Sequence, residues 1–283
     1  MRSYNIGGIG FGFHTAEIIK ESPLYGRFLA DEKEFAALSV KHDFYFDNNL
    51  SLGEKKLVFK TSEVETYSVP GGYVRETSRF DREKFKYICM QSPHAPGGRI
   101  MCTAQSPKGK TSADLFRIID FVSALLYYDA FILHAACVML NDKAYLFCGP
   151  SGAGKSTQAE LWRQYAGAKV MNGDRVLVRK SGSEWLACGL PMCGSSAYCE
   201  NYALPIAVIC FPGHGTENTV NPFSGIQKFM ALSAQITCGA RKPEDSQKLF
   251  SLTEELIKSV TIFGYDCVKD ESAARFLTRY LNL

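Results

Sequence analysis

A glycine-rich motif at residues 149–156 limits the folds that are open to this chain. The segment reads GPSGAGKS and matches the pattern G-x-x-x-x-G-K-[ST]. It follows a short apolar run, AYLFC, and precedes KSTQAELWRQYA, in which apolar residues recur at helical spacing. A strand, a glycine-rich loop and a helix in this order are typical of a phosphate-binding loop in an α/β protein. The sequence therefore predicts an anion-binding loop between a buried strand and the start of a helix.

The residue types in this loop suit a nucleoside triphosphate. Glycines permit positive φ and a close approach of the backbone, so that successive N–H groups and the helix dipole point at one anion. Lys155 brings a charge to the outer phosphates, and the hydroxyl of Ser156 can ligate Mg²⁺. We expect ATP and Mg²⁺ as ligands, although no motif separates adenine from guanine. The expected nucleotide contacts are Gly149, Ser151, Gly152, Ala153, Gly154, Lys155, Ser156 and Thr157.

Charge and composition argue against nucleic-acid and membrane partners. The 283 residues include 32 basic and 29 acidic side chains, for a net charge of +3, which provides no strongly basic surface for a phosphate backbone or a lipid surface. The longest apolar stretch, 121–140, contains Asp129 and His134, and both are costly at the centre of a bilayer. The stretch is therefore predicted to be a helix followed by a buried strand.

The cysteines indicate a reducing compartment. Ten cysteines are present, without a CxxC pair and without histidines at zinc-finger spacing, which argues against a metal cluster. Several of them lie in apolar runs, where a free thiol behaves as a small hydrophobic group. Because the N-terminus shows no pattern of an export signal, we expect reduced thiols and a cytoplasmic location.

Two regions of different character are predicted. Residues 1–105 contain short β-type runs with weak helical periodicity, and breaker-rich segments at 92–99 and 106–112 lie around the end of this region. From Ser112 onward, amphipathic helices alternate with apolar strands. The expected fold is α/β, with a β-rich N-terminal domain and a phosphate-binding domain at 106–283.

Four short segments together carry a family resemblance. They are LHAACV before the loop, GPSGAGKSTQAELW, NGDRV, and GLPMCG, and they fall within residues 131–194. In this order they resemble the catalytic domain of the HPr kinase/phosphorylase family, whose core is related to that of phosphoenolpyruvate carboxykinase. The resemblance implies the P-loop core of that family. The first hundred residues do not resemble the N-terminal domain of the HPr kinases.

The resemblance also implies roles for individual residues. Lys155 and Ser156 would serve the phosphates and Mg²⁺, and His134 would lie near the transferred phosphate. Asp174 matches the second of two adjacent aspartates that share the tasks of activating the acceptor hydroxyl and holding the metal. Gly173 stands in the place of the first aspartate. One carboxylate would have to act as base or as metal ligand, and Asp174, His134 and Lys155 are the expected catalytic residues.

Two classes of function stay open. The first is an ATP-dependent kinase that phosphorylates a hydroxyl, either on a serine of a small protein or peptide or on a small metabolite. The second is a nucleotide-responsive binding module that has lost its chemistry, which Gly173 favours. A decarboxylating transfer has weaker support, since no counterpart of the carboxykinase metal and substrate residues is found. Assembly into a homo-oligomer is also left open.

Three further residues have structural interpretations. Trp162 follows the loop on a helix beside apolar neighbours, so we expect it to pack in the core rather than to stack on a base. Arg175 can reach a phosphate or point outward from the end of a strand. His214, in the segment 212–218, is expected in a loop and receives no chemical role.

Overall fold

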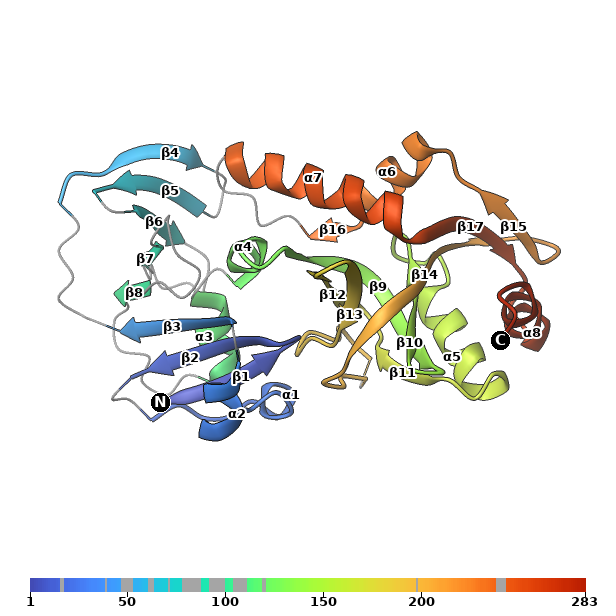
Figure 1. Ribbon diagram of the computed structural model, residues 1–283, viewed down its shortest axis with the longest axis horizontal. Coiled ribbons are helices and arrows are strands. Elements are labelled where there is room, and N and C mark those ends of the chain that lie inside the picture. Colours follow the sequence, from blue (N-terminus) through green and yellow to red (C-terminus); the bar gives the residue numbers. More distant parts are fainter. Residues whose placement is uncertain are drawn as a thin grey trace. The chain divides into compact units, whose positions relative to one another are not determined.

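The chain has a mixed α/β fold that divides into two compact units. The computed structural model describes residues 1–15, 18–38, 40–46, 53–60, 64–70, 72–77, 88–91, 100–103, 111–118, 121–196, 198–237 and 243–283 (Figure 1). Unit 1 comprises Met1–Tyr128 and Gly239–Ser246, and unit 2 comprises Asp129–Cys238 and Gln247–Leu283. The glycine-rich motif at 149–156 lies wholly in unit 2.

Unit 1 contains one eight-stranded mixed sheet. The strands follow the order β1-β2-β3-β8-β7-β6-β5-β4, and β2, β3 and β8 run parallel to one another. All of them lie before residue 105, where the sequence predicts short β-type runs. Their bounds are β1 Arg2–Ile6, β2 Ile9–His14, β3 Val40–Phe46, β4 Lys56–Lys60, β5 Val64–Val69, β6 Gly72–Thr77, β7 Ile88–Gln91 and β8 Ile100–Thr103, with the short helices α1 Pro23–Gly26 and α2 Glu32–Ala37.

An aromatic cluster forms the described core of unit 1. The ring of Phe116 lies between 4.9 and 5.7 Å from the rings of Tyr4, Phe11, Phe13 and Tyr25. Phe116 belongs to helix α3, Ser112–Ile118, which α4, Phe121–Leu126, follows. These contacts explain why unit 1 extends to Tyr128. The predicted domain boundary between 105 and 106 falls in 104–110, outside the described residues, and residues 111–118 and 121–128 belong to unit 1 rather than to the C-terminal unit expected for them.

Unit 2 is a nine-stranded mixed sheet with helices. The main path is β10-β9-β12-β13-β14-β17-β15, while β11 and β16 also pair with β9 and β10 also pairs with β14. The strands are β9 Ala130–Leu140, β10 Lys143–Cys148, β11 Lys169–Asn172, β12 Arg175–Ser181, β13 Glu184–Cys188, β14 Ala203–His214, β15 Thr219–Pro222, β16 Ile236–Thr237 and β17 Thr261–Cys267. The helices are α5 Lys155–Tyr165, α6 Gly225–Ser233, α8 Glu271–Tyr280 and α7 Pro243–Ser259, of which the part from Gln247 onward belongs to unit 2.

The two strands predicted before the glycine-rich loop are confirmed, and they form a hairpin. Strands β9 and β10 are antiparallel, and the pairs run from Leu140 opposite Lys143 to Ala135 opposite Cys148. Asn141 and Asp142 join them with φ of 50° and 55°, the left-handed conformation that a tight hairpin of this kind requires. The predicted division of 121–140 into a helix and a strand is also confirmed, as α4 and β9. Within the described residues, no helix is both long enough and apolar enough to cross a bilayer.

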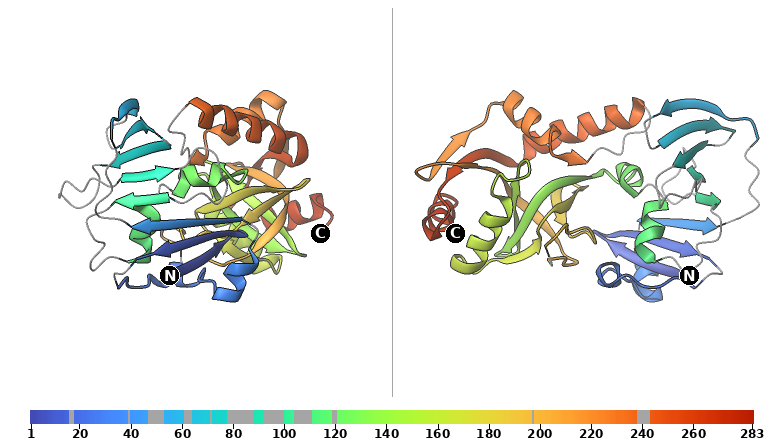
Figure 2. Two further views of the ribbon diagram at one scale, coloured as in Figure 1. Left: turned by 60° about the vertical axis from the view of Figure 1, so that its left-hand side comes forward. Right: turned by 180° about the vertical axis from the view of Figure 1, so that it is seen from behind.

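Helices cover both faces of the unit 2 sheet. Helix α5 packs along β9, β10 and β11 with α8 beside it, and the Gln247–Ser259 part of α7 lies on the other face (Figure 2). An ion pair between Lys180 of β12 and Glu255 joins α7 to the sheet. Under α5, the core is centred on Trp162, which is fully buried with its ring 5.1 Å from Tyr145 and 5.6 Å from Phe147. The packing role predicted for Trp162 is confirmed.

Replacing Trp162 should destabilise unit 2 strongly. Trp162→Ala removes the largest fully buried side chain of the chain's described part and leaves a cavity under α5, so the free energy of unfolding should fall by about 3–5 kcal/mol. Chemical denaturation monitored by circular dichroism measures this change. The matched control is Tyr165→Ala on the same helix, where the side chain is 46% exposed and the loss should stay below about 1 kcal/mol. Equal losses in the two variants would show that the core under α5 does not depend on Trp162.

Candidate functional site

The residues of the candidate site lie around one point of strand β9, at His134 and Ala135. Strand β10 ends at Cys148, opposite Ala135, and the glycine-rich loop begins with the next residue. On the other edge of β9, β11 pairs with its second half and β12 with its first half, and Gly173 and Asp174 separate the two strands. The backbone N–H of Ala135 donates to the carbonyl oxygen of Asp174 at 3.0 Å. The loop, Asp174 and His134 of β9 therefore meet at one position along the sheet.

The loop backbone has the conformation that its glycines permit. Gly152 and Gly154 have φ of 83° and 96°, and Gly154 caps helix α5 without a side-chain hydrogen bond. A side chain would be strained at these φ values, so the glycines expose the backbone at the start of α5. This helix of 11 residues directs its N-terminal N–H groups and the positive end of its dipole into the loop. The geometry suits a bound anion.

Lys155 points into the loop. Its ammonium donates to the carbonyl oxygens of Gly149 at 2.7 Å and Pro150 at 2.9 Å. An ammonium has three N–H donors, so these contacts within the described part of the chain leave one for a ligand. Burial holds the pKa of Lys155 below its ordinary value, while the charge of Asp174 acts in the opposite direction. The ammonium of Lys155 is thus held away from water, where its attraction to an anionic ligand is stronger than it would be in solvent.

His134 and Asp174 form a hydrogen-bonded pair in the pocket. The Nε2–H of His134 donates to Oδ1 of Asp174 at 3.0 Å, and both side chains are about one-third exposed, at 33% and 28%. Arg175 lies further out, with its Nε 3.6 Å from the other carboxylate oxygen and its side chain 45% exposed. The pair leaves the Asp174 carboxylate open to the pocket on one side. A partly exposed carboxylate of this kind can accept a proton or ligate a cation.

A buried amide holds Asp174 in place. Asn172 is fully buried, and its side-chain oxygen accepts hydrogen bonds from the backbone N–H groups of Asp174 and Arg175 at 3.0 and 3.1 Å. Its amide nitrogen donates to the carbonyl oxygens of Leu190 and Met192 at 3.0 and 3.3 Å. This one side chain ties the interruption between β11 and β12 to the segment after β13, and so sets the direction of Asp174.

Gly173 leaves no room for a second carboxylate. Its φ is not in the left-handed region, but a Cβ placed on it would lie 2.3 Å from Oγ and 2.5 Å from Cβ of Ser196. Ser196 is held there because its hydroxyl donates to the carbonyl oxygen of Cys193 at 2.7 Å. Gly194, in the segment after β13, has φ of 58°, and a Cβ at that position would approach the carboxylate carbon of Asp174 to 3.0 Å. The side chain of Ser196 therefore occupies the space in which a side chain at position 173 would lie.

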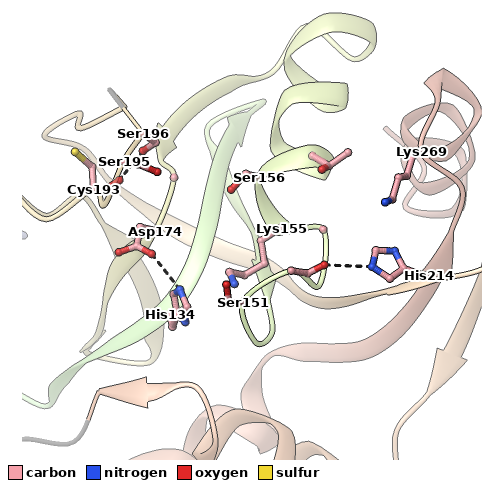
Figure 3. A pocket seen from close by; sticks show the side chains of 14 residues that line it. His134, Ser151, Lys155, Ser156, Asp174, Cys193, Ser195, Ser196, His214 and Lys269 are labelled. Atoms are coloured by element: carbon pink, nitrogen blue, oxygen red, sulfur yellow. Dashed lines mark hydrogen bonds and ion pairs between the residues drawn. The ribbon is translucent and has the colours of Figure 1, made fainter.

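A pocket of about 320 Å³ brings these groups together (Figure 3). Of the predicted contacts, Gly149 and Ala153 do not line it, and Gly149 is buried directly after the end of β10. The other predicted residues all line it. The full lining consists of His134, Ser151, Gly152, Gly154, Lys155, Ser156, Thr157, Gly173, Asp174, Cys193, Ser195, Ser196, His214 and Lys269.

Five of these residues were not identified from the sequence. Cys193, Ser195 and Ser196 belong to the segment after β13. His214 and Lys269 reach the pocket through the pairing of β10, β14 and β17. His214 is the last residue of β14 rather than part of a loop, and β14 runs parallel to β10. Carboxyl ends of parallel strands meet at one edge of a sheet, so this pairing brings His214 beside the loop. Its Nε2–H donates to the carbonyl oxygen of Gly152 at 3.2 Å.

Two oxygen ligands for a hard cation line the pocket. Ser156 lies at the first turn of α5 with an exposed side chain, and Asp174 faces the pocket from the other edge of β9. Mg²⁺ is usually bound through one or two protein oxygens together with substrate phosphates and water, so this pair fits Mg²⁺ held jointly with a phosphate ligand. Within the described ranges, no group of three or more His, Cys, Asp or Glu residues could hold a metal by protein ligands alone.

Comparisons with known proteins do not assign this chain to a family. No family model matches its sequence, and no curated protein matches it.

The contact between Gly173 and Ser196 can be tested by a pair of substitutions. Gly173→Ala should lower the free energy of unfolding by about 1–3 kcal/mol, because its Cβ requires the Ser196 backbone segment to move. Gly173→Ala combined with Ser196→Gly should recover most of that loss. Thermal melting of both variants measures the coupling, and Gly225→Ala, where a Cβ meets open space, serves as the control. A Gly173→Ala variant as stable as the wild type would show that Ser196 does not occupy this space.

Proposed function

We propose that this chain transfers the terminal phosphoryl group of ATP to a hydroxyl group. The observation that carries the proposal is the arrangement around one pocket of a phosphate-binding loop with Lys155 and, across β9 from it, the hydrogen-bonded pair of His134 and Asp174. Phosphoryl transfer depends mainly on positioning and on neutralising charge, and these groups provide both.

The proposed core is of the HPr kinase and carboxykinase-like type. Its support is the order of parts along the chain: a strand with His134, a hairpin, the loop, a helix, and an aspartate at a strand end. The parts that the resemblance links in sequence line the same pocket. His134, in particular, is hydrogen-bonded to Asp174.

The proposed reaction assigns one task to each group. The acceptor hydroxyl attacks the terminal phosphorus, its proton passes to Asp174, and the bond to the bridging oxygen of ADP breaks. His134 holds the carboxylate through its Nε2–H, and Lys155 neutralises charge on the outer phosphates. When bound, Mg²⁺ neutralises further phosphate charge, with Ser156 and Asp174 as the residues that would hold it. Asp174 would then have to serve both the metal and the acceptor proton, in addition to the hydrogen bond that it accepts from His134.

The acceptor is proposed to enter beside Ser195 and Ser196. These residues line the pocket next to Asp174, on the side away from His214. The substrate class is a hydroxyl compound, either a serine of a small protein or peptide or a small metabolite.

One observation favours a second function, a nucleotide-responsive module without transfer activity. Ser196 fills the space beside Gly173, so Asp174 supplies the one carboxylate among the described residues that line the pocket. A site of this kind can bind a nucleotide through its loop and still transfer phosphate slowly or not at all. Measurements of binding and of transfer on the same variants separate the two functions.

ATP binding should depend on Lys155. Lys155→Met keeps the length of the side chain and removes its charge, so the affinity for Mg·ATP should fall about tenfold to a hundredfold. Isothermal titration calorimetry measures the change. The control is Lys258→Met, at an exposed lysine of α7 outside the pocket, which should bind as the wild type does. An unchanged affinity in a folded Lys155→Met protein would remove the loop from the proposal.

Transfer should depend on Asp174 more than binding does. Asp174→Asn keeps the shape but cannot accept the proton, so the transfer rate should fall by about a hundredfold or more while the Kd for ATP changes only a few-fold. Incubation with labelled ATP and a panel of hydroxyl-bearing peptides and metabolites, followed by mass spectrometry, measures transfer. Asp142→Asn in the exposed β9–β10 turn is the control. Tight ATP binding by the wild type without transfer to any acceptor would favour the nucleotide-responsive module instead.

A further inference from the structure

The pocket has two chemically different sides. In the close-up view, the glycine-rich loop has Asp174, His134, Ser195 and Ser196 on one side and His214 and Lys269 on the other (Figure 3). The first side offers a carboxylate and hydroxyl groups, and the second offers an exposed ammonium and an exposed imidazole. A ligand with two chemically different ends would therefore favour one direction between the two sides.

Strand topology places the second side. Strand β17 runs parallel to β14, with Cys267 opposite His214, and β14 runs parallel to β10, which leads into the loop. The three carboxyl ends therefore lie at the same edge of the sheet, and Lys269 follows two residues after the end of β17. The backbone at Lys269 is therefore positioned by regular strand pairing, although its side chain is exposed.

From this arrangement we infer that Lys269 binds the α-phosphate of the nucleotide. The inference rests on the proposed function, since it assumes that the terminal phosphate faces Asp174 and His134. With the terminal phosphate at Asp174 and His134, the β-phosphate lies at Lys155 and the α-phosphate leads toward Lys269. An ammonium at this end pairs with the phosphate that carries the ribose.

His214 contacts the glycine-rich loop on this side. A carbonyl oxygen can only accept, so the imidazole donates its Nε2–H to Gly152 and holds the first turn of the loop against β14. Gly152 has φ of 83°, a conformation that glycine adopts easily and that a fixed contact keeps in one state. The hydrogen bond links the loop to the carboxyl end of β14, and β17, which Lys269 follows, pairs with β14.

The direction of the nucleotide makes a specific prediction about which ligands respond to Lys269. ATP and ADP both carry an α-phosphate, whereas pyrophosphate has only two phosphates and binds where the loop and Lys155 hold it. Lys269→Ala should therefore weaken Mg·ATP and Mg·ADP by the same factor, about five- to tenfold in Kd for a solvent-exposed contact, and leave Mg·pyrophosphate unchanged. Titration calorimetry on the full chain measures all three ligands.

Each other outcome overturns the inference. A loss for ATP without a loss for ADP would mean that Lys269 meets the terminal phosphate and that the nucleotide lies in the reverse direction. Equal losses for all three ligands would assign Lys269 a general electrostatic effect, and no loss would remove it from the site. Lys258→Ala, an exposed lysine of unit 2 outside the pocket, is the control and should bind all three ligands as the wild type does. A wild-type chain that binds neither nucleotide would instead refute the proposed function itself.

Discussion

The site depends on the way in which β9 changes partners halfway along its length. Its second half pairs with β10 and β11, its first half pairs with β12 and β16, and the change occurs at His134 and Ala135. At this point the N–H of Ala135 bonds to the carbonyl oxygen of Asp174, and the N–H of His134 bonds to that of Gln235 at 2.8 Å. A strand that paired uniformly would leave no gap for Asp174 and no room for the loop. One interruption in the sheet therefore brings the glycine-rich loop and Asp174 to the same point of β9.

Maintaining that interruption requires a buried polar side chain. The side chain of Asn172 accepts from two N–H groups at the interruption and donates to two carbonyl groups of the segment after β13, so its own buried amide is fully hydrogen-bonded. Ser196 then fills the space beside Gly173 and is itself bonded to the backbone. These bonds fix the region around Asp174, which suits a group that has to meet an acceptor in one geometry.

Much of this arrangement can be predicted from local sequence, and the remainder depends on pairing between distant strands. The loop, the Asn141–Asp142 hairpin and the packing of Trp162 follow from residue type and spacing, because each is decided by close neighbours. His214 and Lys269 carry no such local pattern, since they reach the pocket only through the parallel pairing of β10, β14 and β17. Ser196 beside Gly173 and the aromatic contacts of Phe116 are likewise tertiary contacts, invisible to periodicity.

The position of the terminal phosphate tests the central claim most directly. A crystal structure of the chain with Mg²⁺ and a non-hydrolysable ATP analogue would locate it relative to both sides of the pocket. The proposal predicts that the terminal phosphate lies between Lys155 and Asp174, within reach of His134, with the ribose toward Lys269. A terminal phosphate turned toward His214 and Lys269, with the Asp174 carboxylate facing only solvent, would contradict it.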